Sequence, residues 1–143
     1  MVHREVGRLT DWRSRLAAEM DRQRNTPFVW GKNDCVYGMA RGVVIALTGE
    51  DPLELWAASY KSEAGARRAL KDMGFTSLEE ALAAYLPKTH PDRADIGDLA
   101  LVPTIGPLRY GVGVVDVSAV IVMTPTGHGF VPRDQIVAAF TVG

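Results

Sequence analysis

The spacing of hydrophobic positions changes near residue 90. Before it, apolar residues recur every three or four positions; after it, they alternate with small or polar residues in short runs rich in valine. The first pattern is typical of amphipathic helices and the second of half-buried strands. We therefore expect an α+β domain whose N-terminal helices (about 8–86) pack on a small C-terminal antiparallel sheet (about 96–143). A chain of 143 residues fits one domain, 1–143.

The best-supported helix follows the segment GKND. Its apolar side keeps helical spacing over three turns, at Val36, Met39, Ala40, Val43, Val44 and Leu47. Gly49 predicts the C-terminal end, because glycine readily takes the left-handed conformation that closes helices. Asn33 or Asp34 would cap the start by accepting hydrogen bonds from free N–H groups. Either cap places Cys35 in the first turn.

Two further helices are expected in the first 60 residues. One follows Thr10 as its cap and ends before RNTPF, with three apolar residues on one face: Trp12, Leu16 and Met20. The other, short, begins at Pro52 after Asp51, since proline suits the first helical position.

Two more helices are expected before the sheet. The first runs from Ser62 to about Met73 and ends at Gly74, with Ala66 and Leu70 facing inward. For the second, SLEEALAAYL, Thr76 and Glu79 predict a capping box. Its apolar side carries Leu78, Leu82 and Tyr85.

The last third of the chain reads as a small sheet. After a loop, PKTHPDRADIG, we expect strands at about 98–102, 111–115, 119–123, 130–131 and 138–142. Glycine, proline and short polar residues separate them, which favours a curled meander with short connections.

Composition narrows the classes of function. The chain has 16 basic and 17 acidic side chains and a formal charge of -1, without the basic excess that a nucleic-acid partner would need. One cysteine excludes an internal disulfide, and the sequence suggests neither a metal site nor a cofactor. We expect no membrane span and no signal peptide, so the chain would be synthesised in the cytoplasm.

Cys35 is the residue with the most reactive side chain. A helix N-terminus stabilises an anion, so its first turn favours a reactive thiolate, and the N–H groups there can bind an oxyanion. The helical phase puts Cys35 at the border of the buried stripe, beside a possible cleft. Against this, free cysteines are often buried and act as small apolar residues. Asp34 would cap the helix, and its charge would raise the thiol pKa.

Several motifs resemble a known superfamily. The stretch TPFVWGKNDCVYGMAR is similar to the nucleophile motif of NlpC/P60 cysteine peptidases, ADIGDLALV to their PGDLVFF strand, and GVGVVD to their HVGIYLG strand. The layout also resembles a small family of phage and prophage proteins encoded near tail genes, which share PFxWGxxDC, GxDP and GDLAL. The likeness runs from about residue 10 to the end.

The resemblance implies a reduced papain-like fold and, in active relatives, a Cys/His pair that cuts the stem peptides of peptidoglycan. It assigns Cys35 as the nucleophile. Aligning VGVV with VGIY puts Gly111 where the general base stands in the superfamily, preceded by Tyr110. Trp30, close to Cys35 in sequence, is a candidate for the wall of a binding cleft, with Asp34 and Tyr110 beside it.

Another histidine could replace the missing base. His128 would lie at the same sheet edge as Gly111 if the strands at 111–115 and 119–123 form a hairpin. The alternative is that His128 sits on an exposed GHG turn with no catalytic role. His90 precedes a proline in a polar loop, and His3 lies in a terminal segment.

Three hypotheses remain open at this point. The chain is a phage tail-tip peptidoglycan peptidase or amidase with Cys35 and His128 as catalytic residues, carried to its substrate in the virion tail. Alternatively, it is a structural or adaptor component of the tail hub that kept the fold without the chemistry. The third is a host cytoplasmic domain in which Cys35 is merely buried.

Overall fold

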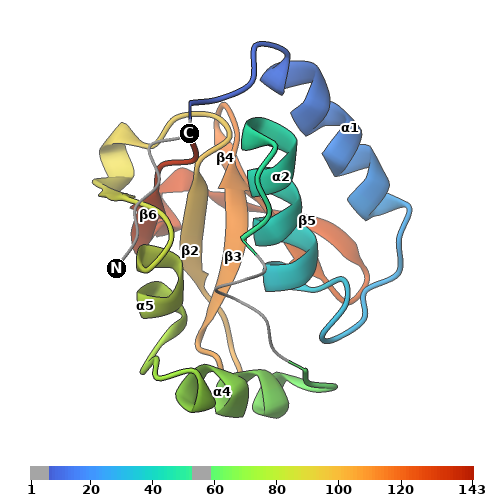
Figure 1. Cartoon of the computed structure of the whole chain (residues 1–143), viewed down its shortest axis with the longest axis vertical. Helices are drawn as coiled ribbons and strands as arrows, with labels where there is room; N and C mark the ends of the chain where they lie inside the picture. The colour runs from blue at the N-terminus through green and yellow to red at the C-terminus, as the bar shows by residue number, and fades with distance from the viewer. Residues whose placement is uncertain (1–6, 53–58) are drawn as a thin grey trace.

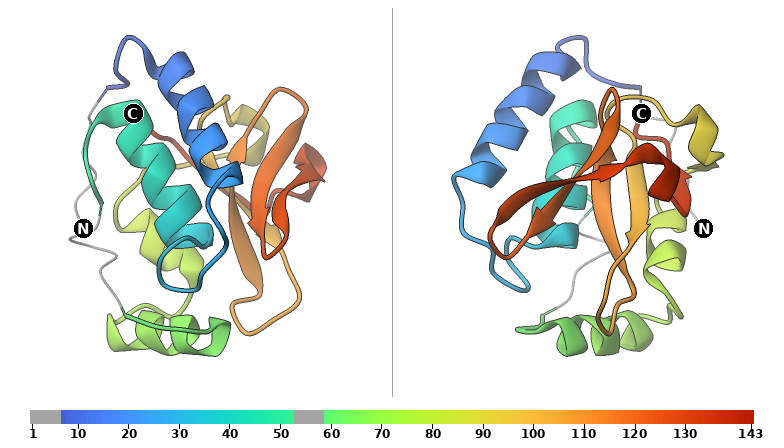
Figure 2. Two further views of the ribbon diagram at one scale, coloured as in Figure 1. Left: turned by 90° about the vertical axis from the view of Figure 1, so that its right-hand side faces the viewer. Right: turned by 180° about the vertical axis from the view of Figure 1, so that it is seen from behind.

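The computed structural model describes residues 7–52 and 59–143 and has two layers, helices on one face of an antiparallel sheet (Figure 1). The side view separates the layers, with helices to one side and strands to the other (Figure 2). The helices are α1 (Trp12–Arg24), the π-helical η1 (Cys35–Ala40), α2 (Arg41–Thr48), α4 (Glu63–Asp72) and α5 (Leu78–Ala83). The α+β prediction is confirmed. The short helix expected from Pro52 falls mostly outside the described residues.

The sheet has six strands in the order β1-β6-β2-β3-β4-β5. They are β1 (Lys88–Thr89), β2 (Leu99–Pro103), β3 (Tyr110–Val115), β4 (Ala119–Thr124), β5 (Gly127–Pro132) and β6 (Ala138–Phe140). Neighbouring strands are antiparallel throughout this order. Two short 3-10 turns, η2 (Pro91–Arg93) and η3 (Arg133–Gln135), precede β2 and β6.

The expected meander is correct only for β2 to β5. After β5, the turn η3 leads back to the free edge of β2, where β6 pairs instead of extending the meander beyond β5. This position fully buries Ala139 and Phe140. β1, inside the segment expected to be a loop, pairs with β6 in turn.

Two helix caps lie one residue later than expected. Asp11, not Thr10, precedes α1, and its side chain makes no capping hydrogen bond. Ser77, not Thr76, caps α5 by accepting from the Glu80 N–H at 3.2 Å, while the Thr76 hydroxyl bonds the Glu80 carboxylate. Thr76 and Ser77 both carry a hydroxyl group that could cap α5, so the sequence alone did not decide between them.

The predicted apolar faces form the core between the layers. Met39, Val43 and Leu47 from the η1–α2 helix and Leu82 from α5 lie fully or almost fully buried against the sheet. Strand β2 is buried on both faces: Leu99 and Leu101 face the helices, and Ala100 and Val102 join a smaller cluster behind the sheet.

The Arg8 side chain connects the two ends of the described chain to each other and to Asp98. The Arg8 guanidinium donates to the Asp98 carboxylate at 2.9 Å and to the Val142 carbonyl at 2.7 Å. Asp98 also accepts the N–H groups of Asp95 at 2.9 Å and Val142 at 3.1 Å. The aspartate of the GDLAL segment is therefore a buried structural anchor beside β2. Its pKa is raised, chiefly by burial, although the backbone hydrogen bonds and Arg8 oppose the shift.

Within residues 7–52 and 59–143, no helix has both the length and the apolar character needed to cross a bilayer.

Candidate functional site

The helix that carries Cys35 begins with a π turn. The Asp34 carbonyl accepts hydrogen bonds from both Gly38 N–H at 2.9 Å and Met39 N–H at 3.0 Å, so the first turn is wider than an α turn. The regular spacing of the apolar residues gave no sign of it. Cys35 lies in the first turn, as predicted.

Asp34 organises this turn and is completely buried. Its Oδ1 accepts from the N–H groups of Val36 at 2.9 Å and Tyr37 at 2.8 Å, which caps the helix. Its Oδ2 accepts from Gly31 N–H at 2.9 Å and from the Tyr60 hydroxyl at 2.7 Å. Four donors thus fix one carboxylate, so Asp34 holds the loop, the helix start and Tyr60 together.

The Cys35 thiol is buried and chemically quiet at neutral pH. The residue is 8% exposed and belongs to the hydrophobic core. Burial raises the thiol pKa to about 12, and the Asp34 charge acts in the same direction. Hydrogen bonds from the backbone of Val112 and of Cys35 itself favour the thiolate but are outweighed. The helix N-terminus therefore does not produce a reactive thiolate.

Contrary to expectation, the described residues form no cleft beside Cys35. The sulfur faces the backbone of β3 at Val112, and β3 packs against η1. A nearby apolar cavity of about 30 Å³ is lined by Val36, Tyr60 and Leu108 together with residues of α4 and α5. Ligand sites usually have roughly 300–1,000 Å³. The burial reflects neighbours from other elements, which the helical phase of Cys35 alone could not reveal.

Along the strand direction, His128 lies near the start of β3, as predicted. It is on β5, however, which β4 separates from β3. It pairs with Met123 across β4 and β5. The β3–β4 register pairs Gly113 with Val122, and continuing it by one residue puts Met123 opposite Val112. Val112 and His128 are thus two strand spacings apart, roughly 10 Å. The Met123 side chain, which packs toward Gly38, belongs to the strand between them. Among the described residues, His128 and Cys35 share no hydrogen bond: the sulfur meets the Val112 backbone and the imidazole meets Gln23.

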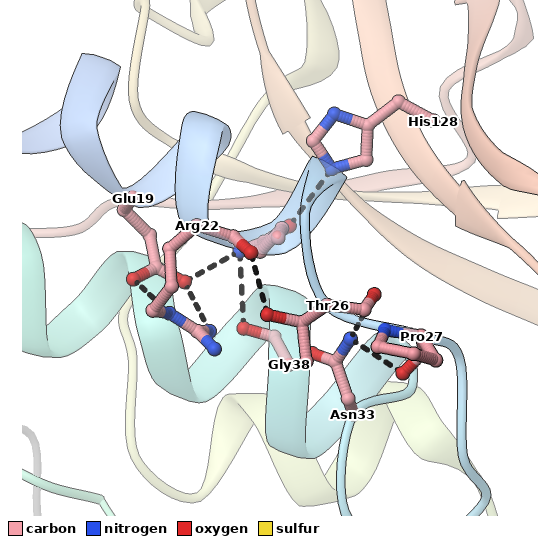
Figure 3. Close-up of polar contacts among 8 residues, drawn as sticks. Glu19, Arg22, Thr26, Pro27, Asn33, Gly38 and His128 are labelled. Carbon is pink, nitrogen blue, oxygen red and sulfur yellow. Dashed lines mark hydrogen bonds and ion pairs between the residues drawn. The ribbon is translucent and has the colours of Figure 1, made fainter.

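The His128 imidazole instead binds α1 (Figure 3). Its Nε2 lies 3.1 Å from Gln23 Oε1, and Gln23 Nε2 donates to Glu19 Oε2 at 2.8 Å and to the Gly38 carbonyl at 3.1 Å. Because the Gln23 amide donates on its other side, its oxygen faces His128, and Nε2 of the imidazole carries the proton. The remaining nitrogen, Nδ1, is buried without a hydrogen-bond partner in the described structure.

This environment favours the neutral imidazole. The pKa of His128 is lowered, first by burial and then by the Arg24 charge, with Glu19 acting in the opposite direction. A proton on Nδ1 would create a buried N–H with no acceptor. His128 is consequently a hydrogen-bonded contact between β5 and α1, and the expectation of an exposed GHG turn is also incorrect.

Trp30, Tyr110 and His90 make contacts of their own. Trp30 is half-buried and meets Phe28 edge to face at 5.0 Å between ring centroids. Tyr110 is half-buried at the start of β3, opposite Pro103. His90 is exposed and accepts a hydrogen bond from Asp92 N–H at 3.1 Å. Among the described residues, none of these three side chains hydrogen-bonds to Cys35.

Two important residues were not identified from the sequence. Tyr60 bonds Asp34, and Gln23 joins His128 to α1. Gln23 extends the face of Trp12, Leu16 and Met20 by one turn, so its burial could have been inferred from helical spacing. Tyr60 gave no such signal, because it is 26 residues away from Asp34 in sequence.

Comparison with known proteins identifies a family but no function. The profile of a family described as a domain of unknown function, DUF6950, matches residues 7–142. No curated protein and no solved structure matches the chain significantly.

The Asp34 carboxylate should be essential for stability. Asp34→Asn replaces one acceptor oxygen by an NH2 group facing donors, so we expect a loss of about 2–4 kcal/mol in the free energy of unfolding. Asp11→Asn is the matched control, because the Asp11 side chain makes no capping bond; its effect should stay within about 0.5 kcal/mol. Urea denaturation of both variants measures this, and equal losses would contradict it.

The Cys35 thiol should be alkylated slowly. With a pKa of about 12 and little exposure, we expect the folded protein to react with iodoacetamide at pH 7.5 at least about 100-fold more slowly than the urea-unfolded chain. Mass spectrometry of timed samples gives both rates. Comparable rates would mean that the sulfur is accessible and ionised.

His128 should make stability depend on pH. Its folded pKa lies below the unfolded value near 6.5, so the unfolded chain binds the proton more readily. The contribution is complete above about pH 6.5 and is lost as the pH falls through the lowered folded pKa. Denaturation from pH 5 to 8 should show this fall in wild type and His90→Gln, but a flatter profile in His128→Gln. Parallel profiles for all three proteins would exclude it.

Proposed function

We propose that this chain, which belongs to the DUF6950 family of domains of unknown function, is a non-catalytic, NlpC/P60-like adaptor of a phage tail hub. The non-catalytic part of the proposal rests on one observation, that Cys35 is buried and protonated. Its thiol is buried, its pKa is raised to about 12, and the candidate base His128 is bonded to Gln23 instead. A cysteine hydrolase without a base loses a factor of roughly 10²–10⁴ in rate.

The NlpC/P60-like part of the proposal rests on sequence likeness and a compatible arrangement. Cys35 begins a helix that packs on an antiparallel sheet, and its sulfur meets β3 beside Gly111, the position that the superfamily gives to the base. A glycine there removes the imidazole while the backbone N–H of Val112 still meets the sulfur. This arrangement is expected of a domain that has kept the fold of a cysteine peptidase and lost its catalytic histidine. The location in the virion tail follows from the resemblance to proteins encoded near tail genes.

An active peptidoglycan peptidase is the competing function. The first-turn position of Cys35 against β3 favours it, since small rearrangements of surrounding residues could expose the sulfur. In that case Cys35 would attack a stem-peptide bond and a histidine would have to move next to it. The two functions differ in their dependence on a single sulfur atom.

Replacing that sulfur separates the two functions. In the phage or prophage that encodes the chain, we expect deletion of the gene to abolish infectious particles, whereas Cys35→Ala should assemble and infect at wild-type levels. The purified wild-type protein should release no muropeptides from peptidoglycan, with a known hydrolase as positive control. Muropeptide release that Cys35→Ala eliminates would establish the peptidase. Absence of the protein from purified particles would reject the adaptor.

A further inference from the structure

A groove of about 510 Å³ lies between α1 and the η1–α2 helix, and Cys35 is not among its lining residues. The two helices run close beside each other on the outer side of the helical layer (Figure 2). This volume falls within the usual range of ligand sites. The lining includes small residues, Ala18, Gly42 and Ala46, which leave space between the helices. Its charged side chains are Arg15, Arg22, Lys32, Arg41 and Glu19.

The one acidic side chain in the lining is turned inward. Glu19 accepts hydrogen bonds from Arg22 Nε at 2.8 Å, Arg22 Nη2 at 2.6 Å and Gln23 Nε2 at 2.8 Å. Its side chain is 11% exposed, whereas that of Arg22 is 48% exposed. Gly42 makes room for this, because a Cβ there would collide with the Glu19 carboxylate. Arg15 is bonded to backbone carbonyls of α2, whereas Arg22, Lys32 and Arg41 reach solvent, although the chain as a whole carries a charge of -1.

These cations retain binding capacity. Arg22 and Arg41 each use Nε and Nη2 on one carboxylate, of Glu19 and Asp51. Within residues 7–52 and 59–143, this leaves three of the five N–H donors of each guanidinium without a partner. The Arg41 charge also opposes the rise in the Arg22 pKa that Glu19 causes, which means that the two guanidiniums repel each other. Lys32 is exposed and has no acidic partner within the described ranges. A bound anion would reduce this repulsion.

The chemistry of the groove fits carboxylates presented by a peptide. Guanidinium groups bind carboxylates in bidentate fashion, and Lys32 supplies a third positive charge at the rim. A nucleic acid would require a longer basic stripe than this groove and a chain of balanced charge provide. We propose that the groove between α1 and α2 binds an acidic segment of a partner protein through Arg22, Lys32 and Arg41.

The inference deepens the proposed adaptor role by naming the chemistry of its partner, and it can fail independently. If the chain proves to be a peptidase, peptide binding at the groove would still stand. If the groove binds no acidic peptide, the tail-hub role could still hold through another surface.

Fluorescein-labelled hexaglutamate is the probe, and fluorescence anisotropy measures its binding. We expect the double variant Lys32→Gln, Arg41→Gln to weaken binding about tenfold or more, because two charge-assisted contacts are lost. The matched control is Arg67→Gln, Lys71→Gln, which makes the same change in net charge on exposed residues of α4 and should alter the affinity less than about twofold. Circular dichroism must show that both variants are folded.

Three results would overturn the proposal. The first is no measurable hexaglutamate binding by the wild type at 1 mM peptide, roughly the weakest affinity expected for a specific contact. The second is an equal loss in both double variants, which would indicate non-specific charge attraction. The third is tighter binding of labelled oligothymidylate than of hexaglutamate, which would assign the groove to nucleic acid. Selective loss in the groove variant alone supports it.

Discussion

The start of the η1–α2 helix depends on one buried carboxylate. Asp34 accepts four hydrogen bonds, from two N–H groups of the helix, one of the preceding loop and the Tyr60 hydroxyl. Burying an unpaired charge would cost several kcal/mol, so these donors are what allow the charge to remain inside the protein. The same charge lies next to the Cys35 sulfur and opposes a second negative charge there. The group that stabilises the helix start therefore also suppresses the thiolate.

The position of His128 is a second consequence of packing. The imidazole and Gln23 connect β5 to α1, and Gln23 continues through the Gly38 carbonyl to the π turn. One hydrogen-bonded chain thus links an edge strand, the first helix and the turn that carries Cys35. A residue engaged in this way has a fixed rotamer and a single protonated nitrogen. It connects the two layers, with its imidazole engaged by Gln23.

Much of the fold was predictable from the chain because it depends on local patterns. The faces of α1, α2, α4 and α5, the strands from β2 to β4 and the glycine ends at Gly49 and Gly74 follow from period and from backbone conformation. The position of β6 was not predictable, because it pairs with the free edge of β2, a strand that lies much earlier in the sequence. The candidate site, likewise, was predicted only in part. Cys35 and its cap Asp34 come from one continuous segment, whereas Tyr60 and Gln23 come from elsewhere.

By itself, the sequence determined that helices precede an antiparallel sheet, that Asp34 or Asn33 begins a helix, and that Cys35 lies in its first turn. Only the tertiary structure decided that the sulfur is enclosed and that His128, on β5, is bonded to Gln23 of α1. The physical reason is that periodicity assigns a residue to a face of its own element. Distances between elements, and with them burial and pKa, depend on strand order and on which side chains pack across the layers. Those determinants combine residues from the whole chain.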